Sequence, residues 1–352
     1  MILKINDRIR NREVKFFSKF QLELKYDAIA STFGFDFFYN PKNQEHVELA
    51  CIGHYHLCTL EHNGQLVLSG IILSESFIDD SKKHLTTFSG YSLPGVLEDC
   101  NIPTSLYPLQ SDGLSLKEIA QKLLKPFNLT MVIDSSVSSK MNEVYEKTTA
   151  SEGQSIRQYL SELASQKNIV ITHNEKGNVV FTQAKTKGDP IIRFTGGVPF
   201  TSMKLTYDGQ PMHSEITVIR QASRGGGNAG ESTIKNPYVP FVYRPKVKTQ
   251  SSGNDIDTES AARTALSEEL KNMKLEIVTD RWEIDGIIIK PNNIITVKNE
   301  NVYLFKETRW FIESVKLIGD ENKMQAVLTC VIPEVYNQDN PKYIYKGVNL
   351  HG

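Results

Sequence analysis

The chain has few cysteines, no excess of one charge and no long apolar run. Its four cysteines are scattered over 352 residues and predict reduced thiols of a cytosolic protein rather than a disulfide framework; they are Cys51, Cys58, Cys100 and Cys330. Lys and Arg total 40 against 41 Asp and Glu, which excludes the global basic excess of dedicated nucleic-acid binders but not a local basic stripe. No stretch approaches the roughly 18 apolar residues of a membrane span, and the first residues lack the apolar core of a secretory signal. We expect no membrane insertion by this chain.

The familiar catalytic motifs are also missing. The sequence contains no G-x-S-x-G, no H-E-x-x-H and no cysteine–histidine signature of a nucleophilic enzyme. Acidic pairs occur at Asp79-Asp80 and Glu98-Asp99, but neighbours in sequence point apart on a strand or turn and do not make an acid/base pair. We expect a protein that is not an enzyme, with no catalytic residue and no cofactor. A site assembled from residues far apart in the sequence stays open.

One glycine cluster has the spacing of a phosphate-binding loop. Gly225, Gly227 and Gly230 form G-x-G-x-x-G within SRGGGNAGES. Such a loop requires a strand before it and a helix after it. A strand-like run does precede the cluster, but Pro237 and two later prolines oppose a following helix. We therefore expect no nucleotide site, and interpret the cluster as a mobile connection that a neighbouring protein orders.

His54, His56 and Cys58 are a candidate metal site, with Cys51 and His62 close by in the sequence. Residues at i, i+2 and i+4 of a strand point to one side, and imidazole and thiolate ligands suit zinc. The alternative, which we favour, places these side chains on the less buried face of a hairpin without any metal.

The sequence divides into β-rich and mixed segments. The strongest hairpin signal is Asn63-Gly64 between two β-rich runs. The predicted class is mainly β with an inserted α/β domain. The predicted parts are a first β domain (1–110 and 188–222), an inserted α/β domain (111–187), a Gly/Pro-rich connecting loop (223–256), a helix with a second β domain (257–335) and a C-terminal tail that needs a neighbour to be ordered (336–352).

The α/β segment contains an internal repeat. Ser115 and Glu118 form a capping box at the start of an amphipathic helix, which a strand follows. The same helix–strand pattern returns further on, with Ser155 in the place of Ser115 and Asn168 in the place of Asn128. We predict two tandem αβ units in one small domain.

Several segments resemble one known family in the same order. FSGYSLPGVLEDC, residues 88–100, is similar to the G-R-S-x-x-x-D-L-V-D-C-S segment of the central baseplate hub proteins of Mu-type contractile phage tails (the phage tail protein D type), although Tyr91 stands for the arginine and Gly95-Val96 for Asp-Leu. The further similar segments are YDAIASTFGFDFF, IAQKLLKPFNLTMVID, SIRQYLSELASQKNIVITHNEKGNVVF and GIIIKPNNIITVKNENVYLFKETRWFIESVKL. The resemblance extends over residues 14 to 335.

The resemblance implies a fold and a function. It implies two antiparallel β-barrels of the tube and hub type with an inserted α/β domain, and a homotrimer whose six barrels form a pseudo-hexameric ring. It implies a structural subunit of the virion tail baseplate, assembled in the host cytoplasm, that joins the six-fold tail tube to the trimeric central spike. The implied partners are further copies of the chain, the spike protein, a tail tube or distal tube protein and the tape-measure protein, with DNA passing transiently through the lumen.

Two other functions stay open. A tail-associated cell-wall hydrolase requires a carboxylate pair in a cleft. A glycan- or receptor-binding tail protein requires exposed aromatic side chains, for which Trp282, Trp310 and the tyrosines of YVPFVY are the candidates, although most aromatic residues lie in cores.

Overall fold

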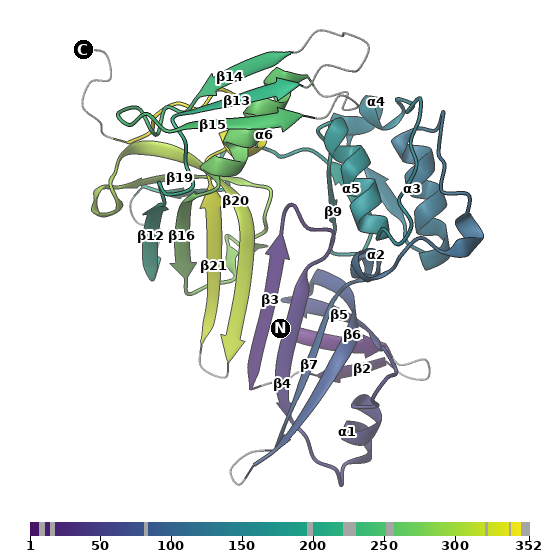
Figure 1. The fold of residues 1–352 in the computed structure, drawn as a ribbon. Helices are drawn as coiled ribbons and strands as arrows, with labels where there is room; N and C mark the ends of the chain where they lie inside the picture. The colour runs from purple at the N-terminus through teal and green to yellow at the C-terminus, as the bar shows by residue number, and fades with distance from the viewer. Residues whose placement is uncertain are drawn as a thin grey trace. The chain divides into compact units, whose positions relative to one another are not determined.

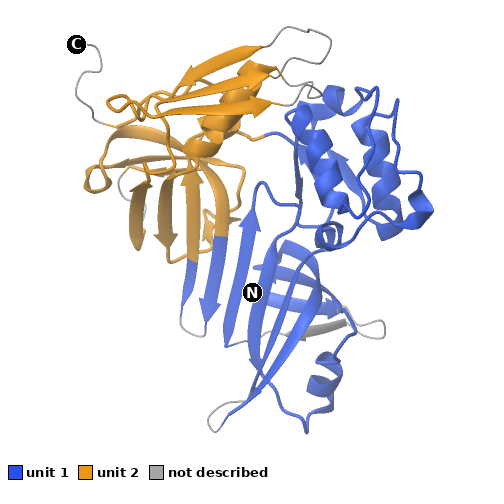
Figure 2. Cartoon of the chain, in the orientation of Figure 1, with its two compact units in different colours: residues 1–183, 316–325 blue, residues 184–315, 326–352 orange. Residues whose placement is uncertain are grey.

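The computed structural model describes residues 1–6, 11–14, 18–80, 84–195, 200–220, 230–250, 257–320, 323–337 and 339–345. The chain forms two compact units: unit 1 is Met1–Gln183 with Lys316–Gln325, and unit 2 is Ala184–Val315 with Ala326–Gly352 (Figure 2). Strands hold 43% and helices 21% of the described residues, so the predicted mainly β class is confirmed. In the described part of the chain, no helix is long and apolar enough to cross a membrane.

Unit 1 begins with antiparallel strands that have one apolar and one polar face. Along β4, Phe33, Phe35 and Phe37 alternate with more exposed residues, as the two-residue period of a strand requires. The ring centroids of Phe35 and Phe37 lie 5.3 and 5.1 Å from that of Phe88 on β7. The elements of this part are β1 (Ile2–Asn6), β2 (Asn11–Val14), β3 (Lys19–Lys25), β4 (Thr32–Phe38), α1 (Gln44–Leu49), β5 (Leu57–His62), β6 (Gln65–Asp79) and β7 (His84–Ser92) (Figure 1).

The predicted hairpin at Asn63-Gly64 is confirmed. Both residues have positive φ, 49° and 76°, which the tightest hairpin turns require at their two central positions. The turn joins β5 to β6, and these strands pair antiparallel.

The inserted α/β part of unit 1 contains the predicted repeat. Ser115 and Glu118 make both hydrogen bonds of the capping box. Asn128 and Asn168 each adopt a left-handed conformation, with φ of 52° and 53°, at the end of the helical region they follow. Helices α3 and α5 share a core with the sheet β8-β10-β9, in which β8 runs parallel and β9 antiparallel to β10. The elements are α2 (Val96–Asp99), α3 (Leu116–Leu124), β8 (Met131–Ile133), α4 (Ser138–Met141), α5 (Ile156–Gln166), β9 (Val170–His173) and β10 (Val179–Thr182).

A half-buried histidine links this α/β part to the first strands. The Nε2 atom of His173 lies 2.8 Å from the Ser31 hydroxyl, and the backbone N–H of Ser31 donates to the Ser92 hydroxyl. Burial lowers the pKa of His173 below its ordinary value of 6.5, while its backbone hydrogen bond to Asn174 opposes that shift.

Acidification is expected to destabilise unit 1 through His173. Because the folded state favours the neutral ring, the unfolded chain takes up a proton first as the pH falls below about 6.5. This contribution to the free energy of unfolding is complete above that pH and declines below it. His173→Gln is expected to reduce the loss of stability between pH 7.5 and 5.5, measured by urea unfolding. His54→Gln, at an exposed histidine, is the control; equal pH slopes for both variants would contradict the prediction.

Unit 2 contains a second set of antiparallel strands and a small separate sheet. β12 pairs with β16 and β16 with β21, both antiparallel, while β11 runs parallel to β19. In the separate sheet, β13 lies between β14 and β15. The elements are β11 (Ile192–Phe194), β12 (Ser202–Tyr207), β13 (Glu215–Arg220), β14 (Glu231–Lys235), β15 (Pro245–Gln250), α6 (Thr258–Leu270), β16 (Met273–Thr279), β17 (Glu283–Ile284), β18 (Ile287–Ile288), β19 (Ile294–Asn299), β20 (Leu304–Asp320), β21 (Met324–Val331) and α7 (Glu334–Asn337).

Two segments differ from the sequence expectation. Residues 188–222, assigned to the first β domain, contribute β11, β12 and β13 to unit 2. Residues 223–256, expected to be a loop, contain β14 and β15. These two strands lie at the edges of their sheet and expose many of their residues, so they lack the apolar alternation by which a strand is recognised. Among the described residues, the strand pairings of the large sheet form an open path rather than two closed barrels.

The described part of the C-terminal tail is held by its own chain. The Tyr238 hydroxyl donates to the Lys342 carbonyl at 2.7 Å, and the rings of Tyr343 and Tyr345 contact the Tyr238 ring. Residues 339–345 therefore have contacts within their own chain, and the need of the tail for a neighbour stays a prediction.

Candidate assembly surfaces

The glycine cluster does not open a helix. Gly230 leads directly into strand β14, whereas a phosphate-binding loop of this kind needs a helix N-terminus at that place. Gly225 and Gly227 lie outside the described residues.

His54, His56 and Cys58 do not share one strand face. β5 begins at Leu57, and Tyr55 has a φ of 48°, which breaks the alternation between the two histidines. Burial raises the pKa of Cys58 to about 12, so the metal-binding thiolate is disfavoured. Among the described residues, no group of three or more His, Cys, Asp and Glu side chains is placed to hold a metal ion.

The aromatic candidates divide between the core and the surface. Trp282 and Trp310 are buried, whereas Phe241 and Tyr243 of the YVPFVY segment are 78% and 77% exposed. The tryptophans therefore lie in the core, whereas the YVPFVY segment offers aromatic surface, as do residues elsewhere in the chain such as Phe38 and Tyr55.

Tyr91 makes a local contact at the position where the resembled family has arginine. Its hydroxyl donates to Asp99 Oδ2 at 2.8 Å, so the acidic residue retains a hydrogen-bond donor. A Cβ atom at Gly95 would lie 2.3 Å from Tyr91 Cδ2; the glycine therefore makes room for the tyrosine ring. The tyrosine at position 91 and the glycine at position 95 are therefore coupled, because a side chain at position 95 would collide with the tyrosine ring. Asp99 and its neighbour Glu98, which pairs with Arg157, are thus engaged in structural contacts.

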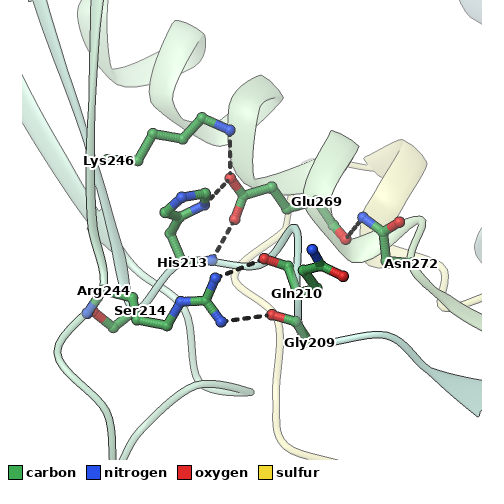
Figure 3. Close-up of polar contacts among 8 residues, drawn as sticks. All are labelled: Gly209, Gln210, His213, Ser214, Arg244, Lys246, Glu269 and Asn272. Atoms are coloured by element: carbon green, nitrogen blue, oxygen red, sulfur yellow. Dashed lines mark hydrogen bonds and ion pairs between the residues drawn. The ribbon is translucent and has the colours of Figure 1, made fainter.

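A buried carboxylate ties the small sheet of unit 2 to α6 (Figure 3). Glu269, only 4% exposed, accepts hydrogen bonds of 2.8 Å from His213 N, His213 Nδ1 and Lys246 Nζ. Arg244 donates to the carbonyl oxygens of Gly209 and Gln210. These hydrogen bonds join α6 to β15 and to the residues before β13, and we interpret the cluster as a structural clamp. It was not predicted from the sequence; the one signal was a glutamate beside the apolar face of the helix.

The same strand order occurs twice in the chain. In the first strand set, β3, β4, β7 and β6 lie side by side in this order. In the second strand set, the order is β12, β16, β21 and β20. Numbered along the chain, both sets have the order 1-2-4-3. The register pairs given for both sets are antiparallel.

The third strand of each set also has the same construction. β6 has 15 residues and β20 has 17. The first part of β6 pairs antiparallel with β5, which directly precedes it, and the first part of β20 pairs in the same way with β19. Five strands with equivalent pairings are therefore repeated, which identifies two copies of one β module.

Each strand set has a polar face on which a lysine lies opposite a carboxylate. On the first set, two neighbouring cross-strand rows are Gln21, Gly34, Ser89, Ser74 and Lys19, Asp36, Thr87, Ser76. On the second set, Lys204 lies opposite Glu276, which lies opposite Thr329. Small polar side chains and opposite charges in facing positions characterise both surfaces.

The fold defined by these elements is that of phage tail proteins and related secretion components. The 43 kDa tail protein of prophage MuSo2 from Shewanella oneidensis has a TM-score of 0.79 at 19% identity, over 96% of this chain and 99% of that one. A tail protein from Neisseria meningitidis has a TM-score of 0.76 at 18% identity, over 96% and 98%. The E. coli c3393 protein, a type VI secretion component structurally similar to the T4 tail proteins gp27 and gp5, has a TM-score of 0.56 at 11% identity, over 98% and 81%.

Residues 94–183 match the model of one family, the second domain of the baseplate hub protein gp44-like proteins. This segment, which includes the repeated αβ units, is similar to a gp44-like second domain. The resemblance to phage baseplate hubs found in the sequence motifs is thereby confirmed. No curated protein sequence matches the chain.

Proposed function

We propose that the chain is a structural hub subunit of a contractile tail baseplate, and that three copies form a ring of six β modules. The repeated strand order of the two strand sets carries this proposal. A cyclic trimer of a chain with two like modules has true three-fold symmetry and approximate six-fold symmetry. Such a ring can join a six-fold tail tube to a three-fold central spike. The closed form of each module as a barrel is part of the proposal.

The polar faces of the strand sets fit a channel through which DNA passes. A surface with surplus lysine and arginine binds phosphates tightly and retards their movement. The first strand set instead opposes Lys19 to Asp36, and the second opposes Lys204 to Glu276. We place the subunit at the virion tail baseplate after assembly in the host cytoplasm, in contact with the spike, a tube protein and the tape-measure protein, and we assign it no catalytic role.

The trimer is the first expected result. Light scattering of the purified protein at micromolar concentration is expected to give three times the 39.8 kDa of the chain, or, after addition of the spike protein, a complex that contains three copies of the chain. A protein that stays monomeric under both conditions contradicts the proposal. Electron cryo-microscopy of the intact tail is expected to place the chain on the axis; a peripheral position would favour the glycan-binding alternative, and clearing of peptidoglycan in a zymogram would favour the hydrolase.

A further inference from the structure

A groove in unit 2 lies between the edge of one strand and one helix (Figure 1). Its volume is about 570 Å³, within the range of about 300–1,000 Å³ of ligand sites in proteins. Four consecutive residues of β14, 232–235, line it. Because successive side chains of a strand point to opposite faces, a groove that contacts all four residues runs along the edge of the strand. The facing walls are Glu259, Ala262 and Arg263 of α6 and Asn340 and Pro341 of the C-terminal tail.

The edge of β14 that borders the groove carries backbone groups that β13 does not use. β14 pairs with β13 and with no other described strand. At one end of this pairing, Arg220 N–H donates to the Gly230 carbonyl at 2.8 Å. At the other end, Asn236 N–H donates to the Ser214 carbonyl at 2.8 Å. Since bonded and non-bonded residue pairs alternate along antiparallel strands, the residues whose backbone N–H and C=O groups point to the groove edge are Glu231, Thr233 and Lys235.

The side chains of β14 predict an alternating pattern for a strand added at this edge. The Ser232 hydroxyl lies 2.8 Å from the Thr258 hydroxyl at the start of α6, so the side chains of Ser232 and Ile234 point toward the helix. Both residues are half-buried, whereas Thr233 is exposed on the opposite face. Every second residue of an added strand therefore points to α6, where Ile234 and Ala262 favour an apolar side chain, and the residues between point to water.

Lys235 determines the charge that fits this edge. It is exposed, lies opposite Glu215 on β13 and makes no ion pair within the described part of the chain. Arg263, in contrast, pairs with Glu259 at 2.8 Å and donates to Asn340 Oδ1 at 2.7 Å, so it serves as a wall of the groove. A carboxylate beside Lys235 on the added strand places opposite charges in neighbouring cross-strand positions, which stabilises the pairing.

We propose that β14 binds an extended peptide segment of another protein, which adds a strand to the small sheet along the groove beside α6. The bound segment alternates apolar and polar residues and carries an aspartate or glutamate next to Lys235. In strand addition of this kind, main-chain hydrogen bonds supply the affinity, and the alternate side chains that enter the groove supply the specificity. The site adds to the proposed hub function and does not depend on it.

Peptide selection on the purified full chain tests the site. From a yeast-displayed library of random decapeptides, we expect enrichment of sequences that alternate apolar and polar residues and contain an acidic residue. Thr233→Pro removes a backbone N–H of the groove edge that does not bond to β13, and proline is tolerated at such edge positions. It is expected to weaken binding of a synthetic enriched peptide by more than about tenfold, measured by fluorescence polarisation.

Two further variants separate the backbone from the side chains. Thr233→Val keeps the N–H and is expected to change the affinity by less than about twofold. Lys235→Glu, an exposed substitution that leaves the fold intact, is expected to shift the enriched peptides from acidic to basic residues. Urea unfolding of each variant provides the control for folding.

Three results would overturn the proposal. The first is a selection that enriches no peptide. The second is an enriched peptide that binds Thr233→Pro as tightly as the wild type, or the same acidic peptides enriched on Lys235→Glu. The third is a Thr233→Pro variant that folds but loses the association seen by light scattering, because a second copy of the chain then occupies the edge. A wild-type chain that binds the peptides but stays monomeric with and without the spike contradicts the hub proposal alone.

Discussion

Replacing Gly90 by alanine is expected to reduce the free energy of unfolding by about 3 kcal/mol or more. A Cβ atom at this position would lie 1.9 Å from the Ile71 carbonyl oxygen and 2.9 Å from the Phe33 ring. The carbonyl belongs to the neighbouring strand β6, so relief requires β6 and β7 to move apart rather than one side chain to rotate. Urea unfolding of the purified protein, followed by circular dichroism, measures the change.

Gly34→Ala is the matched control. Gly34 lies on the adjacent strand β4 of the same strand set, and its added Cβ atom would meet Phe88 O at 3.6 Å and Ser89 Cβ at 3.9 Å, ordinary contact distances. We expect a change of less than about 1 kcal/mol. Equal losses at the two glycines would show that the loss reflects alanine in this sheet in general, and not the close approach of β6 to β7.

Replacing Glu269 by alanine is expected to destabilise unit 2 by about 2 to 4 kcal/mol. The carboxylate is almost fully buried and accepts from Lys246 and His213. Its removal leaves the partly buried Lys246 ammonium without this counter-charge and releases the β13–β15 sheet from α6. Thermal unfolding and hydrogen exchange are expected to show lower protection in β13 and β15 than in the wild type.

The neighbouring residue provides the control for this prediction. Glu268 pairs with Lys271 on the same helix, but its side chain is 60% exposed, and exposed pairs contribute little. Glu268→Ala is expected to change the free energy of unfolding by less than about 0.5 kcal/mol. If the two variants unfold alike, Glu269 is not the clamp that its geometry indicates.

Local features of the fold could be predicted from the sequence because each of them depends on only a few residues. The capping box of Ser115 and Glu118 spans one helical turn, and the Asn63-Gly64 turn needs only positive φ at two positions. The equivalence of Asn128 and Asn168 was visible because each must leave the helix in the left-handed conformation that asparagine tolerates. Contacts between residues that are close in the sequence depend little on the rest of the chain.

Features that depend on distant partners were missed for a physical reason. The alternation of Met203 and Leu205 along β12 predicts a strand and its faces, but it carries no information on the neighbouring strand; the pairing with β16 follows from chain segments about 70 positions away. β14 and β15 were taken for a loop because edge strands with a solvated face need few apolar residues. Glu269 looked like a solvated helix residue, and only His213 and Lys246 make its burial favourable.

The sequence by itself determined the mainly β class, the inserted tandem αβ units and, through ordered short motifs, the relation to baseplate hubs. Those properties depend on turn chemistry, helix caps and side-chain periodicity, which act between residues close in the chain. Only the tertiary structure decided that two strand sets share the order 1-2-4-3, and that β12 pairs with β16 alone among the described strands. Strand order is a property of hydrogen bonds between distant segments, and no local pattern of residues specifies it.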